Sequence, residues 1–203
     1  MRVCLVLPIR SLREGKTRLA SVLDAQARES LIVGMLHHVL QQAARFPGLQ
    51  YTLVVSPCAD ARAYATRFGA RALEEAIPNL NRALTQAHRE ARATGAEQLM
   101  VVPCDLPLVS EEDLRQLAIA SDRTVAIAPD SHGTGTNGLC VPAAASFDFA
   151  FGPESFVRHG EAVRRLGFEV QIVRRAGLAF DLDTPDDLQR VRELPAPHIK
   201  AAQ

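Results

Sequence analysis

Short apolar runs alternate with amphipathic segments along this chain of 203 residues. The first run, Val3 to Leu7, is apolar without interruption, as expected of a strand that is buried on both faces of a sheet. The segment from Asp24 to Arg45 instead repeats its apolar residues at helical spacing. The pattern therefore predicts an α/β fold, with a mostly parallel sheet and helices on both faces.

The same interpretation extends along the rest of the chain. Further strands are expected at residues 51–55, 98–102, 124–128, 138–141 and 169–173. Further helices are expected at 59–68, 80–93 and 155–166, and from Ser110 and Thr184 onward. Ser110 and Thr184 precede acidic residues, which suit a helix cap and the positive end of a helix dipole. We expect a single domain over residues 1–194 and a loose tail over 195–203.

The overall composition excludes several classes of protein. Lys+Arg and Asp+Glu both number 23, so no net charge attracts nucleic acid or an anionic membrane. The four cysteines form no Cys-x-x-Cys pair, and no apolar run approaches the ~18 residues of a membrane span. We expect a cytoplasmic protein that binds neither nucleic acid nor membrane and could assemble as a homodimer.

The loop after the first strand is unusually basic. It carries Arg10, Arg13, Lys16 and Arg18 within nine residues, and ligands of such sheets bind beyond the carboxyl ends of the strands. The planar forks of Arg and the point charge of Lys suit phosphate oxygens. A solvated basic loop is the alternative. The Gly-x-x-x-x-Gly-Lys-Ser/Thr pattern of a P-loop does not occur.

Three carboxylates follow later strands. Asp105 comes directly after an apolar run, between two prolines, and Asp181 and Asp183 are two residues apart in a segment expected to be extended. Side chains at that spacing point the same way, and neighbouring carboxylates repel unless a cation lies between them. Mg²⁺, which takes oxygen ligands, is the expected cation. A turn or cap role is the alternative for each aspartate.

Two glycine-containing stretches complete the candidate site. Thr136 lies in a Gly-Thr-Asn sequence, and Gly152 and Ser155 lie in Phe-Gly-Pro-Glu-Ser-Phe. Glycine permits close approach of the backbone, and a serine at a helix start can hold an anion. A surface loop and a helix cap explain each feature equally well. His132 and His159 fit either a catalytic or a structural role.

Together these motifs resemble the 2-phospho-L-lactate guanylyltransferase family of coenzyme F420 biosynthesis, which includes enzymes that use phosphoenolpyruvate or 3-phospho-D-glycerate. The resemblance covers residues 7–188. Each motif alone is weak, but their joint order is specific. The matching sequences are Gly-Lys-Thr-Arg-Leu (15–19), Pro-Cys-Asp-Leu-Pro (103–107), Pro-Asp (129–130) with Gly-Thr-Asn (135–137), Phe-Gly-Pro-Glu-Ser-Phe (151–156) and Asp-Leu-Asp-Thr-Pro (181–185).

The resemblance implies a GT-A-like nucleotidyltransferase fold. It also implies a reaction in which a phosphate oxygen of the acid attacks the α-phosphorus of GTP and pyrophosphate leaves. Lys16, Arg18 and Asp105 would be the catalytic residues. The implied site places Arg10, Lys16, Arg18 and Asn81 around the nucleotide, Asp105, Asp181 and Asp183 around Mg²⁺, and Thr136, Gly152 and Ser155 around the phospho-acid.

Two positions depart from the family pattern, and two other functions stay open. Arg10 replaces a common lysine, and Asn79 replaces a common glycine. One alternative function is a molybdopterin or sugar-phosphate nucleotidyltransferase of the same fold, although the glycine-rich opening of those enzymes is missing here. The other is a noncatalytic nucleotide-binding subunit, although all three candidate metal carboxylates are present. The three acids share a phosphate and a carboxylate, so the sequence leaves the acceptor open among them.

Overall fold

The computed structural model describes residues 2–118 and 121–194 and shows one seven-stranded sheet in the order β3-β2-β1-β4-β6-β5-β7. The tail predicted for 195–203 lies outside the described residues. The strands are β1 (Val3–Pro8), β2 (Thr52–Ser56), β3 (Arg71–Glu74), β4 (Gln98–Val101), β5 (Thr124–Pro129), β6 (Thr136–Pro142) and β7 (Glu169–Ile172).

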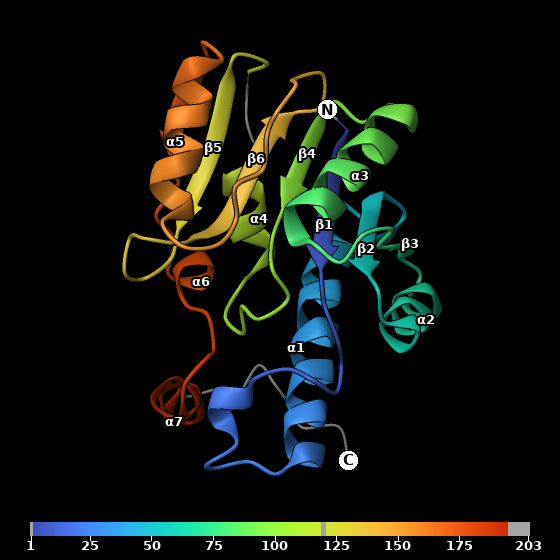
Figure 1. Ribbon diagram of the computed structural model, residues 1–203, viewed down its shortest axis with the longest axis vertical. Helices are drawn as coiled ribbons and strands as arrows, with labels where there is room; N and C mark the ends of the chain where they lie inside the picture. The colour runs from blue at the N-terminus through green and yellow to red at the C-terminus, as the bar shows by residue number, and fades with distance from the viewer. Residues whose placement is uncertain (1, 119–120, 195–203) are drawn as a thin grey trace.

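Helices cover both faces of this sheet, which confirms the predicted α/β fold. Figure 1 shows α3 and α5 in front of the sheet and α4 behind it. The helices are α1 (Ala25–Arg45), α2 (Ala59–Phe68), α3 (Leu80–Ala93), α4 (Glu111–Leu117), α5 (Ser155–Arg165), α6 (Ala176–Ala179) and α7 (Pro185–Glu193), with short 3₁₀ turns η1 (Thr17–Leu19) and η2 (Leu49–Tyr51).

The strand directions bring the candidate motifs to one edge of the sheet. β1 pairs in parallel with β2 and β4, β2 with β3, and β5 with β7. β6 runs antiparallel to both β4 and β5. Because β6 is reversed, its first residue, Thr136, lies at the edge where β1, β4 and β5 end. The sheet is therefore mostly parallel, as predicted.

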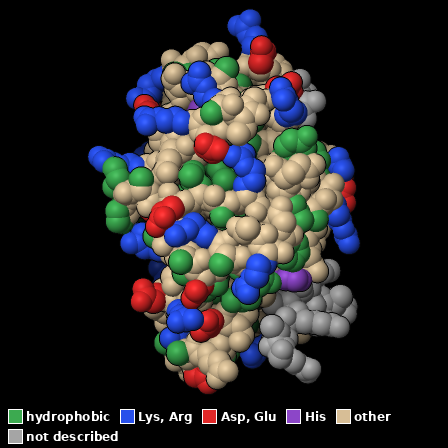
Figure 2. Space-filling model, turned by 90° about the vertical axis from the view of Figure 1, so that its right-hand side faces the viewer, with side chains coloured by type: hydrophobic (Ala, Val, Ile, Leu, Met, Phe, Trp, Pro, Cys, Tyr) green, Lys and Arg blue, Asp and Glu red, His purple; other side chains and the backbone are tan. Residues whose placement is uncertain are grey.

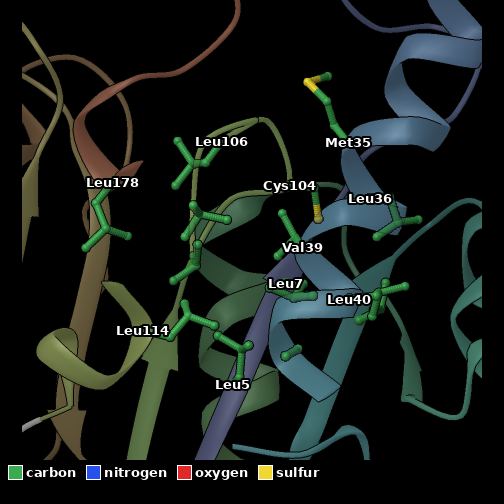
Figure 3. Packing of buried hydrophobic residues seen from close by; sticks show 14 of the residues in the cluster. Leu5, Leu7, Met35, Leu36, Val39, Leu40, Cys104, Leu106, Leu114 and Leu178 are labelled. Carbon is green, nitrogen blue, oxygen red and sulfur yellow. The ribbon is translucent and has the colours of Figure 1, made fainter. Parts of the chain in front are cut away.

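Two apolar layers hold the helices against the sheet. Along β4, Met100 packs into the layer that contains α1, α2, α4, α6 and α7, whereas its neighbours Leu99 and Val101 pack into the layer of α3 and α5. Figure 3 shows Val39 of α1 beside Leu7 of β1 within the first layer. Full burial of such a side chain stabilises the fold by roughly 1.5 to 3 kcal/mol. This packing holds β1 and β4 in place, and the loops that carry the candidate residues start from their ends.

Two elements are missing from the predicted pattern, and a third begins earlier than predicted. β3 is a half-exposed edge strand of the sequence Arg-Ala-Leu-Glu, whose charged ends conceal its alternation. α6 has four residues, which is too short for a helical period to be visible. β6 also begins at Thr136, two residues before the predicted start. That shift places Thr136 on the strand instead of in the preceding loop.

The surface agrees with the balanced charge of the sequence. Figure 2 shows basic and acidic side chains interspersed over the face in view. Among the described residues, no helix is both long and apolar enough to cross a membrane.

Candidate active site

A pocket of about 360 Å³ lies beyond the carboxyl ends of β1 and β4. Most of its lining comes from the end of β1 and the loop that follows it, and the rest comes from α1, the segment 103–105 and Asp183. Arg10, Lys16 and Arg18 line it together with Asp105. The pocket therefore combines predicted phosphate-binding cations with two of the predicted metal ligands.

The loop after β1 has a fixed shape. The Ser11 hydroxyl accepts hydrogen bonds from two backbone N–H groups of the turn that follows it, at 3.1 and 3.0 Å. A Cβ atom at Gly15 would lie 2.7 Å from Cδ1 of Ile32 on α1, so the loop approaches the helix where a side chain would not fit without movement. Lys16 then adopts a left-handed backbone conformation with φ 55° and leads into η1.

Lys16 joins two of the candidate carboxylates. Its Nζ atom donates to Asp105 Oδ2 and to Asp183 Oδ1, each at 2.7 Å, and its side chain is only 10% exposed. Burial acts to lower the pKa of Lys16, but the charges and hydrogen bonds of the two aspartates together outweigh it, so the pKa is raised. Lys16 is therefore positively charged near neutral pH, between the two aspartates.

Backbone contacts explain why residues so distant in sequence meet here. The N–H of Leu182 donates to the carbonyl of Asp105 at 3.1 Å, which joins the segment after β4 to the segment before α7. The start of α7 is in turn fixed by a capping box between Thr184 and Asp187. Asp187 also accepts the N–H of Asp183 at 3.2 Å, so the aspartate beside Lys16 is held at the helix entrance.

Asp181 lies close to the same group. Its Oδ1 accepts a hydrogen bond from Asn137 Nδ2 at 3.2 Å. Burial raises the pKa of Asp181, the Asn137 hydrogen bond lowers it, and the negative charges of Asp105 and Asp183 raise it further. Sequence reasoning did not identify Asn137 as a site residue, although it is the last residue of the Gly-Thr-Asn motif.

The carboxylates suit Mg²⁺ chemically but do not form a complete cage. Within residues 2–118 and 121–194, no set of three or more His, Cys, Asp and Glu side chains is arranged to hold a metal ion. Mg²⁺ usually binds one or two carboxylates and keeps waters or substrate phosphates as its other ligands. Burial is the main cause of the raised pKa of Asp181, and the charges of Asp105 and Asp183 add to it; a bound cation would relieve that repulsion. Mg²⁺ binding by Asp105, Asp181 and Asp183 stays a prediction.

The four cations of the basic loop do not act alike. Arg18 Nη1 lies 3.8 Å from Asp183 Oδ2, and Arg10 and Arg18 both line the pocket. Arg13 instead forms surface ion pairs with Glu29 at 3.3 Å and Asp60 at 3.2 Å. Arg13 is not among the residues that line the pocket, so only three of the four cations of the loop are placed together there.

The two asparagines at the start of α3 have defined contacts. Asn79, which departs from the family pattern, caps α3 by accepting the backbone N–H of Arg82 at 3.1 Å. The Asn81 amide is paired with the backbone of Phe151, from which it accepts at 2.8 Å and to which it donates at 3.1 Å. Asn81 thereby ties α3 to the segment before α5. Its contact with guanine stays a prediction.

The predicted acceptor residues meet around the start of α5. Gly152 has φ 122°, a conformation that favours glycine, and Ser155 is the first residue of the helix. The N–H of Phe156 donates to the carbonyl of Thr134 at 3.0 Å, which holds the helix start against the segment that enters β6. Thr136 and Ser155 are both buried. None of the three predicted acceptor residues is among those that line the pocket beside Lys16.

Comparison with known proteins relates this site to a family. The model of the family described as "Guanylyl transferase CofC like" matches residues 3–192. A phosphoenolpyruvate guanylyltransferase of Rubrobacter xylanophilus is 39% identical, with 94% of each chain covered. One of Sphaerobacter thermophilus is 35% identical, with 94% of this chain and 93% of the relative covered.

Solved structures show the same fold at low sequence identity. A candidate nucleotide-diphospho-sugar transferase of Desulfovibrio desulfuricans superposes with a TM-score of 0.77 at 17% identity, over 95% of this chain and 87% of that one. CMP:2-keto-3-deoxy-manno-octonic acid synthetase superposes with a TM-score of 0.62 at 14% identity, over 95% and 97%. The fold is that of GT-A-like nucleotidyltransferases, and with the family match over nearly its whole length the chain belongs to the CofC-like guanylyl transferases.

Proposed function

We propose that this enzyme transfers GMP from GTP to the phosphate of a three-carbon phospho-acid, with release of pyrophosphate, in coenzyme F420 biosynthesis. The observation that carries the proposal is the position of Lys16, held between Asp105 and Asp183 in a pocket that Arg10 and Arg18 also line. Phosphoenolpyruvate is the first acceptor to test because both relatives described above bear its name.

The proposed reaction brings two anions together. An oxygen of the acceptor phosphate forms a bond to the α-phosphorus of GTP, while the bond from that phosphorus to the pyrophosphate oxygen breaks. Lys16 and Arg18 would neutralise the charge that develops on the triphosphate. Mg²⁺ held by Asp105, Asp181 and Asp183 would supply further positive charge at the phosphates.

The remaining residues of the site would orient these groups. Asn137 holds Asp181 through the hydrogen bond from its amide, at 3.2 Å. Thr136, Gly152 and Ser155 would hold the phospho-acid beside the start of α5. Catalysis would then depend on position and charge, because transfer to an existing phosphate oxygen needs no covalent intermediate on the protein.

A direct assay tests this function and its alternatives. Purified enzyme is given GTP with phosphoenolpyruvate, 2-phospho-L-lactate, 3-phospho-D-glycerate or a sugar 1-phosphate, and released pyrophosphate is measured. We expect release only with Mg²⁺, GTP and one of the three acids. Release with the sugar phosphate alone would favour a sugar-phosphate nucleotidyltransferase. No release under any condition would contradict the proposed transfer.

Ser155→Ala should weaken binding of the phospho-acid without weakening binding of GTP. A hydroxyl at the start of α5 can donate to a phosphate or carboxylate, and losing a hydrogen bond to a charged group removes roughly 1.5 to 3 kcal/mol. We expect the KM for the acid to rise about ten- to a hundredfold, with the KM for GTP nearly unchanged. Ser146→Ala, at an exposed serine outside the pocket, is the matched control. If Ser155→Ala raised only the KM for GTP, the nucleotide and not the acid would bind at the start of α5.

A further inference from the structure

His159 is hydrogen-bonded through both ring nitrogens. It lies on α5 and is fully buried. The backbone N–H of Ala150 donates to its Nε2 atom at 3.0 Å, so Nε2 carries no proton. The proton of the neutral ring is then on Nδ1. Nδ1 lies 3.0 Å from Oγ1 of Thr136, and therefore donates to the hydroxyl.

The surroundings of the ring keep it neutral and in one orientation. Burial, followed by the positive charge of Arg158, lowers the pKa of His159 to about 4. The ring also packs against Phe147 and Phe151, whose ring centroids lie 6.0 and 4.7 Å from its own. Near neutral pH the imidazole therefore has no second proton to place on Nε2, and the hydrogen bond from Ala150 is preserved.

This arrangement determines what the Thr136 hydroxyl can do. A hydroxyl has one proton to donate and lone pairs that accept. In Thr136 a lone pair is engaged by His159 Nδ1–H, and the part of the chain that the structure describes offers Oγ1 no other side-chain partner. Thr136 is buried, and these contacts leave its hydroxyl proton for an anionic ligand bound against the start of β6.

The segment around Ala150 is itself held in place. Phe151, the next residue, is paired through its backbone with the Asn81 amide on α3, at 2.8 and 3.1 Å. Gly152 and Ser155 follow within the same segment. A chain of hydrogen bonds therefore runs from α3 through residues 150–151 and His159 to Thr136.

We propose that His159 is a positioning residue for the acid substrate, one that engages a Thr136 lone pair through Nδ1–H and leaves the hydroxyl to donate to the phosphate or carboxylate of the acid. This inference rests on the proposed function and extends it to a residue that does not itself contact substrate. It also assigns His159 a role in substrate binding without proton transfer.

Two substitutions separate this role from simple packing. In His159→Asn the side-chain amide nitrogen occupies nearly the place of Nδ1 and can still donate to Thr136, but the contact with Ala150 is lost. In His159→Gln the longer side chain can still accept from Ala150 through its oxygen, but it has no donor at the position of Nδ1. The two variants are similarly polar, and each keeps one of the two hydrogen bonds.

The readouts are the KM values for the acid and for GTP, measured with the acid that supports turnover in the wild type. We expect His159→Gln to raise the KM for the acid about tenfold, which is typical for the loss of one hydrogen bond, while the KM for GTP changes less than twofold. His159→Asn should stay within about threefold of the wild type for both substrates. In a Thr136→Val background, His159→Gln should add little, because the group that it positions is already gone.

Other results would contradict the proposed role of His159. Equal losses in the Asn and Gln variants, equal effects on both substrates, or a full additional loss in the Thr136→Val background would show that His159 only supports packing. These results would overturn the inference and leave the proposed function intact. A wild-type enzyme that turns over none of the three acids would overturn both. Melting temperatures of all variants exclude unfolding as the cause.

Discussion

Asp105→Asn is expected to lower kcat by about a thousandfold, because a metal ion at a phosphoryl group contributes several kcal/mol to its transition state. Asp105 lines the pocket from the segment that follows β4, and its carboxylate accepts a hydrogen bond from Lys16 Nζ at 2.7 Å. The variant keeps the shape of the side chain but removes its charge. Steady-state assays across a range of Mg²⁺ concentrations should show both a lower kcat and a higher Mg²⁺ requirement.

The control for Asp105→Asn is Asp122→Asn, which makes the same change of charge at an exposed position before β5. Its kcat and Mg²⁺ requirement should stay within about twofold of the wild-type values, because an exposed charge far from the site interacts only weakly with it. If Asp105→Asn retained most of the activity at ordinary Mg²⁺ concentrations, Asp105 would have a turn or cap role, and the metal would need other ligands.

Local chemistry predicted several elements correctly. Ser110 and Thr184, each followed by acidic residues, begin α4 and α7 with complete capping boxes, in which Asp113 and Asp187 take the third helical position. Such a cap depends on neighbours within four residues, so its signal lies in the sequence. The continuous apolar run of β1 likewise indicates a strand buried on both faces of a sheet, and β1 lies inside the sheet between β2 and β4.

Contacts between distant residues were not predictable in the same way. Lys16 meets Asp183 across 167 positions of sequence, and the pairing depends on how β1, β4 and α7 assemble. The motifs placed Lys16 and Asp183 in one site but assigned one to phosphate and the other to metal, so their direct contact was not expected. The Asn137–Asp181 hydrogen bond was missed for a related reason. It forms only because the segment after α6 runs beside the start of β6.

The basic loop offers a test in which neighbouring residues of like charge should behave differently. Lys16 is 10% exposed and bridges two aspartates, whereas the Arg13 side chain is 67% exposed and pairs with Glu29 and Asp60. A surface pair of that kind is worth about 0 to 1 kcal/mol. In the Lys16 pairs only the ammonium is buried, because the Asp105 and Asp183 side chains are 33% and 41% exposed. Of these two residues, Lys16 is therefore the one placed to affect both the bound triphosphate and the carboxylates.

Lys16→Ala is expected to lower kcat/KM for GTP by about a hundredfold or more, while Arg13→Ala should remain within about threefold of the wild type. The Lys16 variant would lose its proposed charge-assisted contact to the triphosphate, worth roughly 1.5 to 3 kcal/mol. It also leaves Asp105 and Asp183 without the cation that now lies 2.7 Å from each. Steady-state kinetics with GTP varied at saturating acid distinguish the variants, with melting temperatures to confirm folding. Equal losses from the two substitutions would mean that the loop acts as a general basic surface, and the central position of Lys16 would then have no special part in nucleotide binding.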